Sequence, residues 1–508
     1  MGNVLGVLDE VALAGADNAL RLHQDNNNKG ADVSGDLFLY QRISRRLLEQ
    51  IHSGAWAVGD RLPSVRHLSK LFGVSVNTVM QCYRQLEADG YLEIRPQSGV
   101  FVRRADADGM PSPEDSRYPL LPVEVSLSEQ VLRYMALHAR NDVVRLGIAL
   151  PGAEVLPVAR VMSVLRDVTR RQPLEAWDYL HPNVHNPLSH QLARRSLAFE
   201  QPYAADDIII TNGCMEALTL ALRSVSKPGD AIAVESPTYY GTLLLLEAHQ
   251  RRVVEVPAHP EDGISLSALE QVFQQKRVAA CMVATNAQNP LGFTMSAARK
   301  QALVALSARY GVPLIENDVW GDTVFNEGDG VPAKAWDSEG LVLYCNSFSK
   351  TLMPGLRLGW AVGGRFHRRL LELKQLSTIT SPSLSQLAMG RMLESGAYSQ
   401  HLRELRSALR SQVVAMTALI AAAFPAGTHI SRPSGGCVLW LRLPPGVDGD
   451  TLFLEAERAG IHVFPGAVFS AMADYRNYLR INAGNPVSDS VRAAVVQLGH
   501  LATELAKG

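Results

Sequence analysis

Cysteine is scarce in this chain of 508 residues. The five cysteines stand singly along the sequence, and no two have the CxxC spacing of a redox or zinc motif. This pattern excludes a disulfide framework and a zinc knuckle, so we expect no metal site and a reducing, cytoplasmic compartment. Long hydrophobic runs are also missing. No stretch of about 18 apolar residues occurs, and residues 1–36 lack the basic and apolar regions of a signal peptide, so we expect no membrane partner.

The chain has no excess of either charge. It contains 49 Lys and Arg residues against 50 Asp and Glu residues, and 47% of its residues are hydrophobic. This composition excludes a disordered chain, and at roughly 100–200 residues per domain the length predicts several globular domains. The charge is unevenly spread, however, because residues 41–104 hold ten basic and five acidic residues. We therefore expect a polyanion partner for the N-terminal part alone.

The basic part is expected to form three short helices and a hairpin. Apolar residues recur at helical spacing over 39–51, Pro63 begins a second helix, and Ser75 can cap a third. Residues 92–102 then alternate as two strands around a Pro-Gln-Ser-Gly turn, which completes the pattern of a winged helix-turn-helix. The expected domains are a flexible extension at 1–37, the winged helix-turn-helix at 38–104, a linker rich in Asp, Gly, Pro and Ser at 105–125, and the main domain at 126–508.

The third helix begins with side chains that suit the reading of DNA. A recognition helix places small polar groups at its N-terminal end, where they enter the major groove, and nearby donors grip phosphates. The candidates for contact with double-stranded DNA are Arg66, Ser75, Asn77, Thr78, Gln81 and Gly99.

This basic part resembles the GntR family of bacterial transcription regulators. Residues 62–66 (Leu-Pro-Ser-Val-Arg) are similar to that family's LPSxR motif, and residues 73–79 are similar to its turn and recognition helix. The resemblance implies operator binding, with all the candidates except Gln81 among the contacts. Relatives often carry an arginine where this chain has Val76, which implies a different base preference.

Apolar, β-rich runs alternate with longer helical segments through the main domain. Examples are residues 208–210, 231–234 and 281–284. Continuous apolar strands separated by helices predict a parallel sheet that is covered on both faces, and hence an α/β fold.

Several segments of the main domain carry side chains that suit an aromatic aldehyde bearing a phosphate. Lys350 follows an expected strand, at the end where α/β sheets place ligands, and a lysine there can form an imine with an aldehyde. The turn at 211–215 leads into a helix whose free N–H groups suit a phosphate, and Arg357 adds a positive charge for the same anion. Tyr239 offers a flat ring for stacking, and Asn289 offers a neutral donor for a phenolate oxygen.

In this order and spacing the segments resemble fold-type I pyridoxal-phosphate enzymes of the aspartate aminotransferase superfamily, which have a small C-terminal α+β part. Together with the N-terminal part, the chain resembles the MocR subfamily of GntR regulators. The resemblance implies pyridoxal 5'-phosphate as cofactor, with Lys350 as its Schiff-base lysine. It also implies that Arg480 grips a substrate carboxylate and that Tyr179 reaches the phosphate of the neighbouring subunit. The other implied cofactor contacts are Gly213, Cys214, Met215, Tyr239, Asn289, Ser347, Ser349 and Arg357.

One motif departs from the family. The family has an acid, two further residues and a tyrosine, and the acid keeps the pyridine nitrogen protonated so that the ring accepts electrons. Here Asn317 takes the acid's place, Asp318 follows it and Trp320 replaces the tyrosine; we expect all three near the cofactor. Because successive strand residues point to opposite faces, Asp318 can substitute for the acid only if the strand twists or bulges. Val184, in place of a usual glycine, is a second departure.

Three functions are compatible with these motifs. The first is a pyridoxal-phosphate-dependent transcription regulator, a homodimer with a domain-swapped arrangement, which senses a small amino compound through an external aldimine and so changes its hold on operator DNA. The second is a genuine aminotransferase, of 2-aminoadipate or aromatic type, that carries a DNA-binding module; Asn317 argues against it. The third is a regulator whose main domain never binds the cofactor; Ser347, Lys350 and Arg357 argue against that.

Overall fold

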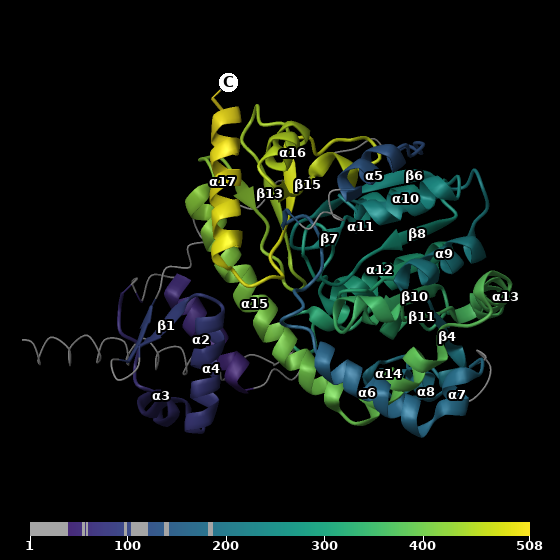
Figure 1. Ribbon diagram of the computed structural model, residues 1–508, viewed down its shortest axis with the longest axis horizontal. Coiled ribbons are helices and arrows are strands. Elements are labelled where there is room, and N and C mark those ends of the chain that lie inside the picture. The colour runs from purple at the N-terminus through teal and green to yellow at the C-terminus, as the bar shows by residue number, and fades with distance from the viewer. Residues whose placement is uncertain are drawn as a thin grey trace, which may run out of the picture. The chain divides into compact units, whose positions relative to one another are not determined.

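The described residues form two compact units, one within Met1–Asp108 and one within Gly109–Gly508 (Figure 1). The computed structural model describes residues 39–52, 56, 59–95, 99–102, 120–136, 142–180 and 186–507. The expected extension at 1–37, most of the expected linker and Val184 lie outside these residues. Within the described ranges, no helix has the length and apolar character needed to cross a membrane.

The small unit is a winged helix-turn-helix, as the sequence predicts. Ser64 caps α3 through its hydroxyl, and α3 ends at Gly73, whose φ of 63° suits a glycine. Ser75 caps α4 by accepting a hydrogen bond from the N–H of Thr78 at 3.1 Å. Leu47, Leu68 and Tyr83 are buried in the core that the helices and the hairpin share. The described elements are α2 (Leu39–His52), α3 (Val65–Phe72), α4 (Val76–Ala88), β1 (Leu92–Arg95) and β2 (Gly99–Val102).

The large unit is built on an eight-stranded sheet of order β4-β11-β10-β9-β8-β5-β6-β7. Neighbours from β10 through β6 are parallel, whereas β11 runs antiparallel to β10 and β4, and β7 runs antiparallel to β6. The predicted parallel sheet is therefore confirmed for β10 through β6, and β11 and β7 make the whole sheet mixed. The short connection from β10 to β11 has no room for the crossover helix that a parallel pair needs. The strands are β4 (Ile208–Thr211), β5 (Ala231–Ser236), β6 (Arg252–His259), β7 (Gly263–Ile264), β8 (Ala280–Val283), β9 (Leu314–Asn317), β10 (Val342–Ser347) and β11 (Gly359–Val362).

Helices cover both faces of this sheet, and strand residues alternate between the two cores. On β4, Ile209 belongs to the core that contains α9, whereas Ile208 and Ile210 belong to the core formed with α6, α8 and α14. This two-sided burial explains why the strands read as continuous apolar runs. The helices are α5 (Ser128–Ala136), α6 (Val158–Arg171), α7 (Pro173–Trp177), α8 (Pro187–Arg195), α9 (Cys214–Val225), α10 (Tyr240–Ala248), α11 (Leu266–Gln274), α12 (Ala297–Tyr310), α13 (His367–Thr378) and α14 (Ser383–Glu394).

The C-terminal part adds a second, antiparallel sheet of order β12-β13-β16-β15. Its strands are β12 (His429–Ile430), β13 (Val438–Arg442), β15 (Phe464–Pro465) and β16 (Tyr478–Asn482). The helices α15 (Ala397–Ala423), α16 (Gly449–Arg458) and α17 (Asp489–Leu505) accompany it (Figure 1). A two-stranded parallel pair joins β3 (Val144–Arg145), from the N-terminal part of the large unit, to β14 (Ile461–His462) of the C-terminal part. This is the small α+β part that the family resemblance implies.

Residues 120–125, which the sequence placed in the linker, belong to the large unit. Val123 forms a β-bridge with Val253 of β6, and the guanidinium of Arg277 donates to the carbonyl of Leu120 at 3.2 Å. Val125 is buried in the main core. The expected linker therefore extends too far, because these few apolar residues form no helix or strand of their own that a sequence pattern could reveal.

Candidate functional site

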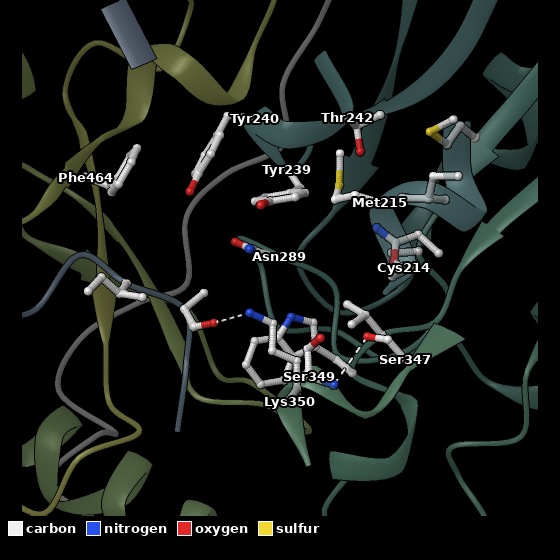
Figure 2. Close-up of a pocket in the computed structure, with 18 of the residues that line it drawn as sticks. Cys214, Met215, Tyr239, Tyr240, Thr242, Asn289, Ser347, Ser349, Lys350 and Phe464 are labelled. Carbon is white, nitrogen blue, oxygen red and sulfur yellow. Dashed lines mark hydrogen bonds between the residues drawn. The ribbon is translucent and has the colours of Figure 1, made fainter. Parts of the chain in front are cut away.

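A cavity of about 290 Å³ lies where the carboxyl ends of β5, β8, β9 and β10 meet (Figure 2). This is the edge at which open α/β sheets bind ligands. Residues from distant segments, singled out in the sequence, come together in its wall. They are Cys214, Met215, Tyr239, Asn289, Asn317, Trp320, Ser347, Ser349, Lys350 and Arg357.

Lys350 carries the amine of this cavity. It ends a short 3-10 helix, Phe348–Lys350, that follows β10 directly. Its Nζ donates to the carbonyl oxygen of Ala149 at 2.6 Å and lies 5.1 Å from the centre of the Trp320 ring. Burial lowers the pKa of Lys350 to about 8, and the positive charges of Arg480 and Arg357 act in the same direction. A neutral, nucleophilic amine is therefore available much closer to neutral pH than on an ordinary lysine.

One end of the cavity suits an anion, and we call it the phosphate end. Figure 2 shows Cys214, Met215 and Ser347 together on this side. The helix α9 begins here at Cys214, so its first N–H groups have no partner within the helix. Arg357 donates to the carbonyl of Asn212 at 3.0 Å and also lines the cavity. These are the groups that a phosphate dianion requires.

Gly213 makes this arrangement possible. Its φ is 85°, and a Cβ at this position would lie 2.6 Å from Nη2 of Arg357. A larger residue would be strained and would push the guanidinium away. Gly213 is not itself part of the cavity wall, and we expect it to act by letting Arg357 approach the start of α9.

Figure 2 shows Tyr239 and Asn289 in the middle of the cavity, above Lys350, with Tyr240 on one side and Met215 and Cys214 on the other. Tyr239 follows β5, and its ring packs so tightly over Gly241 that a Cβ there would lie 2.3 Å from a ring carbon. Asn289 is buried, and its Oδ1 accepts a hydrogen bond from Nη1 of Arg480 at 3.2 Å. The positions allow the stacking and hydrogen-bonding roles that the resemblance implies, and those roles stay predictions.

Asn317 and Asp318 point to opposite sides of β9. Asn317 lines the cavity, where its Oδ1 accepts a weak hydrogen bond from Sγ of Cys214 at 3.5 Å. The carboxylate of Asp318 is buried outside the wall of this cavity and accepts from Asn286 at 2.8 Å and from the hydroxyl of Tyr344 at 3.0 Å. The expectation that Asp318 contacts the cofactor is therefore wrong, because the strand end neither twists nor bulges enough to turn its side chain round.

Arg480 lies just behind the cavity wall on β16. It is fully buried, donates to Asn289 and to the carbonyl of Gly147, and its Nε has no hydrogen-bond partner among the described residues. The rings of Tyr240, Phe464 and Phe469 surround its guanidinium, with centroids 5.6, 4.9 and 5.1 Å away. An entering carboxylate would find a buried cation with one unused donor.

Other residues of the cavity wall carried no recognisable signal in the sequence. Ile148, Tyr240, His462 and Phe464 line the cavity, and Tyr240 alone stood next to a predicted contact. Glu235 lines it as well; burial raises its pKa to about 7, and the N–H of Ala284 and the amide of Gln288 hold its carboxylate.

Tyr179 lies elsewhere on the large unit. It is 61% exposed and does not line the cavity, and the strongly exposed Leu174 and Trp177 precede it on α7. An exposed tyrosine in this position is compatible with a contact to a neighbouring subunit, and that contact stays a prediction.

The small unit presents its predicted DNA contacts at the start of α4 and beside it. Arg66, Asn77 and Gln81 are exposed. Ser75 is exposed too, and its hydroxyl bonds to the Thr78 hydroxyl at 2.8 Å as well as capping α4. Gly99 opens β2 with a φ of 120°, close to the guanidinium of Arg61. These positions suit insertion of α4 into a major groove.

The large unit has the architecture of pyridoxal-phosphate aminotransferases, and the small unit has that of a DNA-binding module. Comparison with known proteins agrees: residues 144–497 match aminotransferase class I and II, and residues 39–102 match the gntR family of bacterial regulatory proteins. The chain therefore belongs to the aminotransferase class I and II family, joined to a GntR domain as in the MocR subfamily.

Individual relatives reflect both halves. The chain is 38% identical over 463 residues to the HTH-type transcriptional regulator YjiR of Escherichia coli K12, covering 91% of this chain and 98% of the relative. It is 29% identical over 401 residues to aromatic-amino-acid aminotransferase 1 of Thermococcus litoralis, covering 76% of this chain and 96% of the relative. The crystal structure of a multiple substrate aminotransferase from Thermococcus profundus is similar with a TM-score of 0.69 at 26% identity, covering 75% of this chain and 96% of that one.

The family uses pyridoxal phosphate, and the cavity residues fit this group. Gly213 leaves the space in which Arg357 approaches the start of α9, a combination that suits the phosphate. Lys350 has the lowered pKa that reaction with an aldehyde requires, and Tyr239 has a ring in the same cavity. The donor set therefore agrees with both the phosphate and the aldehyde of the cofactor.

Proposed function

We propose that this protein is a cytoplasmic transcription regulator that binds operator DNA through its small unit and a small amino compound through its large unit. The observation that carries the proposal is that one chain has both a cavity lined by a buried lysine, Lys350, and an exposed recognition helix, α4. Pyridoxal phosphate, when bound, supplies an aldehyde that captures amines. The chain's own residues supply the nucleophile at Lys350, the phosphate end and the carboxylate partner Arg480.

Asn317 favours binding over turnover. An amide cannot provide the negative charge that keeps a pyridine nitrogen protonated, and the carboxyl of the next residue, Asp318, is held on the other face of β9. Imine chemistry at Lys350 does not depend on that charge. The cavity therefore has what is needed to capture an amino compound and lacks a group that supports fast proton removal from it.

The test combines a spectrum with a DNA-binding assay. The full-length protein loaded with pyridoxal phosphate should show the visible absorbance of a lysine-bound cofactor, and a panel of amino acids should change both that band and the affinity for duplexes from the gene's own promoter region. Lys350→Ala should abolish the band and the response to amino acids but retain DNA binding. A band that persists in this variant after dialysis, or equal weak affinity for every duplex, would contradict the proposal.

A genuine aminotransferase is the second candidate function. The cavity keeps Lys350, Tyr239 and Arg480 in positions that transamination also requires, and the Thermococcus litoralis relative is named an aminotransferase. Asn317 is the observation that places this candidate second. A catalytic rate within the ordinary enzyme range would reverse the order.

We also propose that the protein is a homodimer in a domain-swapped arrangement. Leu174, Trp177 and Tyr179 are 77%, 85% and 61% exposed, although large apolar side chains are normally covered. A second copy of the chain would cover them and bring Tyr179 to the phosphate of its neighbour. Analytical ultracentrifugation should show a dimer that Trp177→Glu weakens, and a monomer at micromolar concentration would contradict this arrangement.

A further inference from the structure

We propose that the amino compound is an amino acid with a large apolar side chain. The proposal rests on the proposed function, because it assumes that an amino compound enters the cavity beside Lys350. It comes from the end of the cavity that lies away from the phosphate end, which we call the aromatic end. This end is lined by Met135, Ile148, Tyr240, His462 and Phe464.

The backbone at 147–149 fixes where an amino acid's side chain would lie. The carbonyl of Gly147 accepts from Arg480, and the carbonyl of Ala149 accepts from Nζ of Lys350. Ile148 therefore stands between the carboxylate partner and the amine partner. An amino acid held at both places has its α-carbon beside this segment, and its side chain extends toward Ile148 and the aromatic end.

The aromatic end is a continuous apolar surface. The rings of Tyr240 and Phe464 are parallel with centroids 4.8 Å apart, and the ring of His462 packs edge-on against Phe464 at 5.6 Å. Figure 2 shows Tyr240 and Phe464 on the opposite side of the cavity from Met215 and Ser347. Flat aromatic faces and branched aliphatic groups gain most from burying a partner of the same kind.

The charged groups near the cavity already have partners or assigned places. Among the described residues of its wall, Glu235, Lys350 and Arg357 carry charge, and His462 can titrate. Glu235 is held by Ala284 and Gln288, and Arg357 belongs to the phosphate end. Arg480 lies beside the aromatic end, since its guanidinium is 5.6 Å from the centre of the Tyr240 ring and 4.9 Å from that of Phe464, and it is assigned to the α-carboxylate. A second carboxylate would have to share this one cation, and an ammonium would be repelled by it, so an uncharged side chain is favoured.

The test is a spectral titration of the full-length protein loaded with pyridoxal phosphate. Phenylalanine and leucine should shift the visible band at concentrations at least about tenfold lower than alanine, since even one buried methylene is worth about tenfold or more. Glutamate and lysine should bind more weakly than phenylalanine, so that they shift the band only at concentrations higher by a similar factor or more. Equal or tighter binding of alanine, glutamate or lysine overturns the proposal but leaves the proposed function intact. A loaded protein whose band responds to none of these amino acids also overturns the proposal, and the proposed function itself fails if no other amino compound shifts the band.

A change of specificity provides the second test. Ile148→Arg places a cation beside the expected position of the amino acid's side chain. The variant should bind phenylalanine more weakly and glutamate more tightly, so that glutamate becomes the tighter ligand of the two. The matched control is Leu376→Arg, because Leu376 on α13 is 82% exposed and lies outside the cavity wall. The control should keep the order of the unmodified protein. If Ile148→Arg retains the cofactor band and leaves the ratio of phenylalanine to glutamate affinity unchanged, the side chain does not lie at the aromatic end.

Discussion

Replacing Asn317 by Asp should speed the transfer of an amino group from an amino acid to the cofactor. Asn317 lines the cavity, and its Oδ1 contacts the thiol of Cys214, so an aspartate would place a carboxylate where the cavity now has an amide. An opposite charge within about 4–6 Å moves a pKa by about 1–3, and a pKa change of one corresponds to about 1.4 kcal/mol. Stronger protonation of the cofactor's pyridine nitrogen should therefore raise the half-reaction rate by about 10–1000-fold.

The assay is stopped-flow absorbance with one amino acid donor. We expect the unmodified protein to bind the donor within seconds and to form the pyridoxamine form of the cofactor slowly, whereas Asn317→Asp forms it sooner. Asp318→Asn is the matched control, because Asp318 is hydrogen-bonded on the far face of β9 and its loss should not slow the reaction. The reasoning is refuted if the unmodified protein already turns over at about 1–1000 per second, the ordinary enzyme range.

Three further predictions concern the lysine, the phosphate end and the DNA contacts. The rate at which cofactor-free protein gains the visible band should rise with pH through about 8, the lowered pKa of Lys350, since the neutral amine reacts; a midpoint near 10.5 would contradict the assigned environment. Gly213→Ala should lose pyridoxal phosphate on dialysis because a Cβ there meets Arg357, whereas Gly355→Ala, with open space around it, should retain the cofactor. Arg66→Ala should weaken operator binding by about 1–3 kcal/mol and reduce its salt dependence, measured by fluorescence anisotropy at several salt concentrations; unchanged affinity would remove Arg66 from the interface.

Local chemistry made much of this protein predictable. Ser75 was predicted to cap a helix, and the structure uses it in that way; the helix predicted to begin at Pro63 starts two residues later, capped by Ser64. The continuous apolar strands predicted an α/β core for a different reason. A strand that is buried on both faces has no alternation of polar and apolar residues. The antiparallel direction of β11 was not predicted, because the direction of a strand depends on the length of its connection and not on its composition.

The cavity was predictable only in part. Lys350, Arg357 and Tyr239 stand in motifs whose order in the chain points to one ligand. Ile148 and Phe464 meet only because β3 and β14 bring their segments together, and no local pattern records that meeting. The alternation of side chains along β9 means that only one of Asn317 and Asp318 can face the cavity. The backbone path at the end of the strand decides that it is Asn317.

The hydroxyl of Ser75 has two roles, and together they restrict which amino acids can occupy position 75. As the cap of α4 it accepts from the N–H of Thr78, and a cap position accommodates Ser, Thr, Asn, Asp or Gly. As an exposed group at the helix end that is predicted to meet DNA, it would also have to tolerate nearby phosphates, which repel an aspartate. We therefore expect only small, uncharged caps at this position in related proteins, and we expect their operator preferences to diverge through the residues at 76 and 77, here Val76 and Asn77.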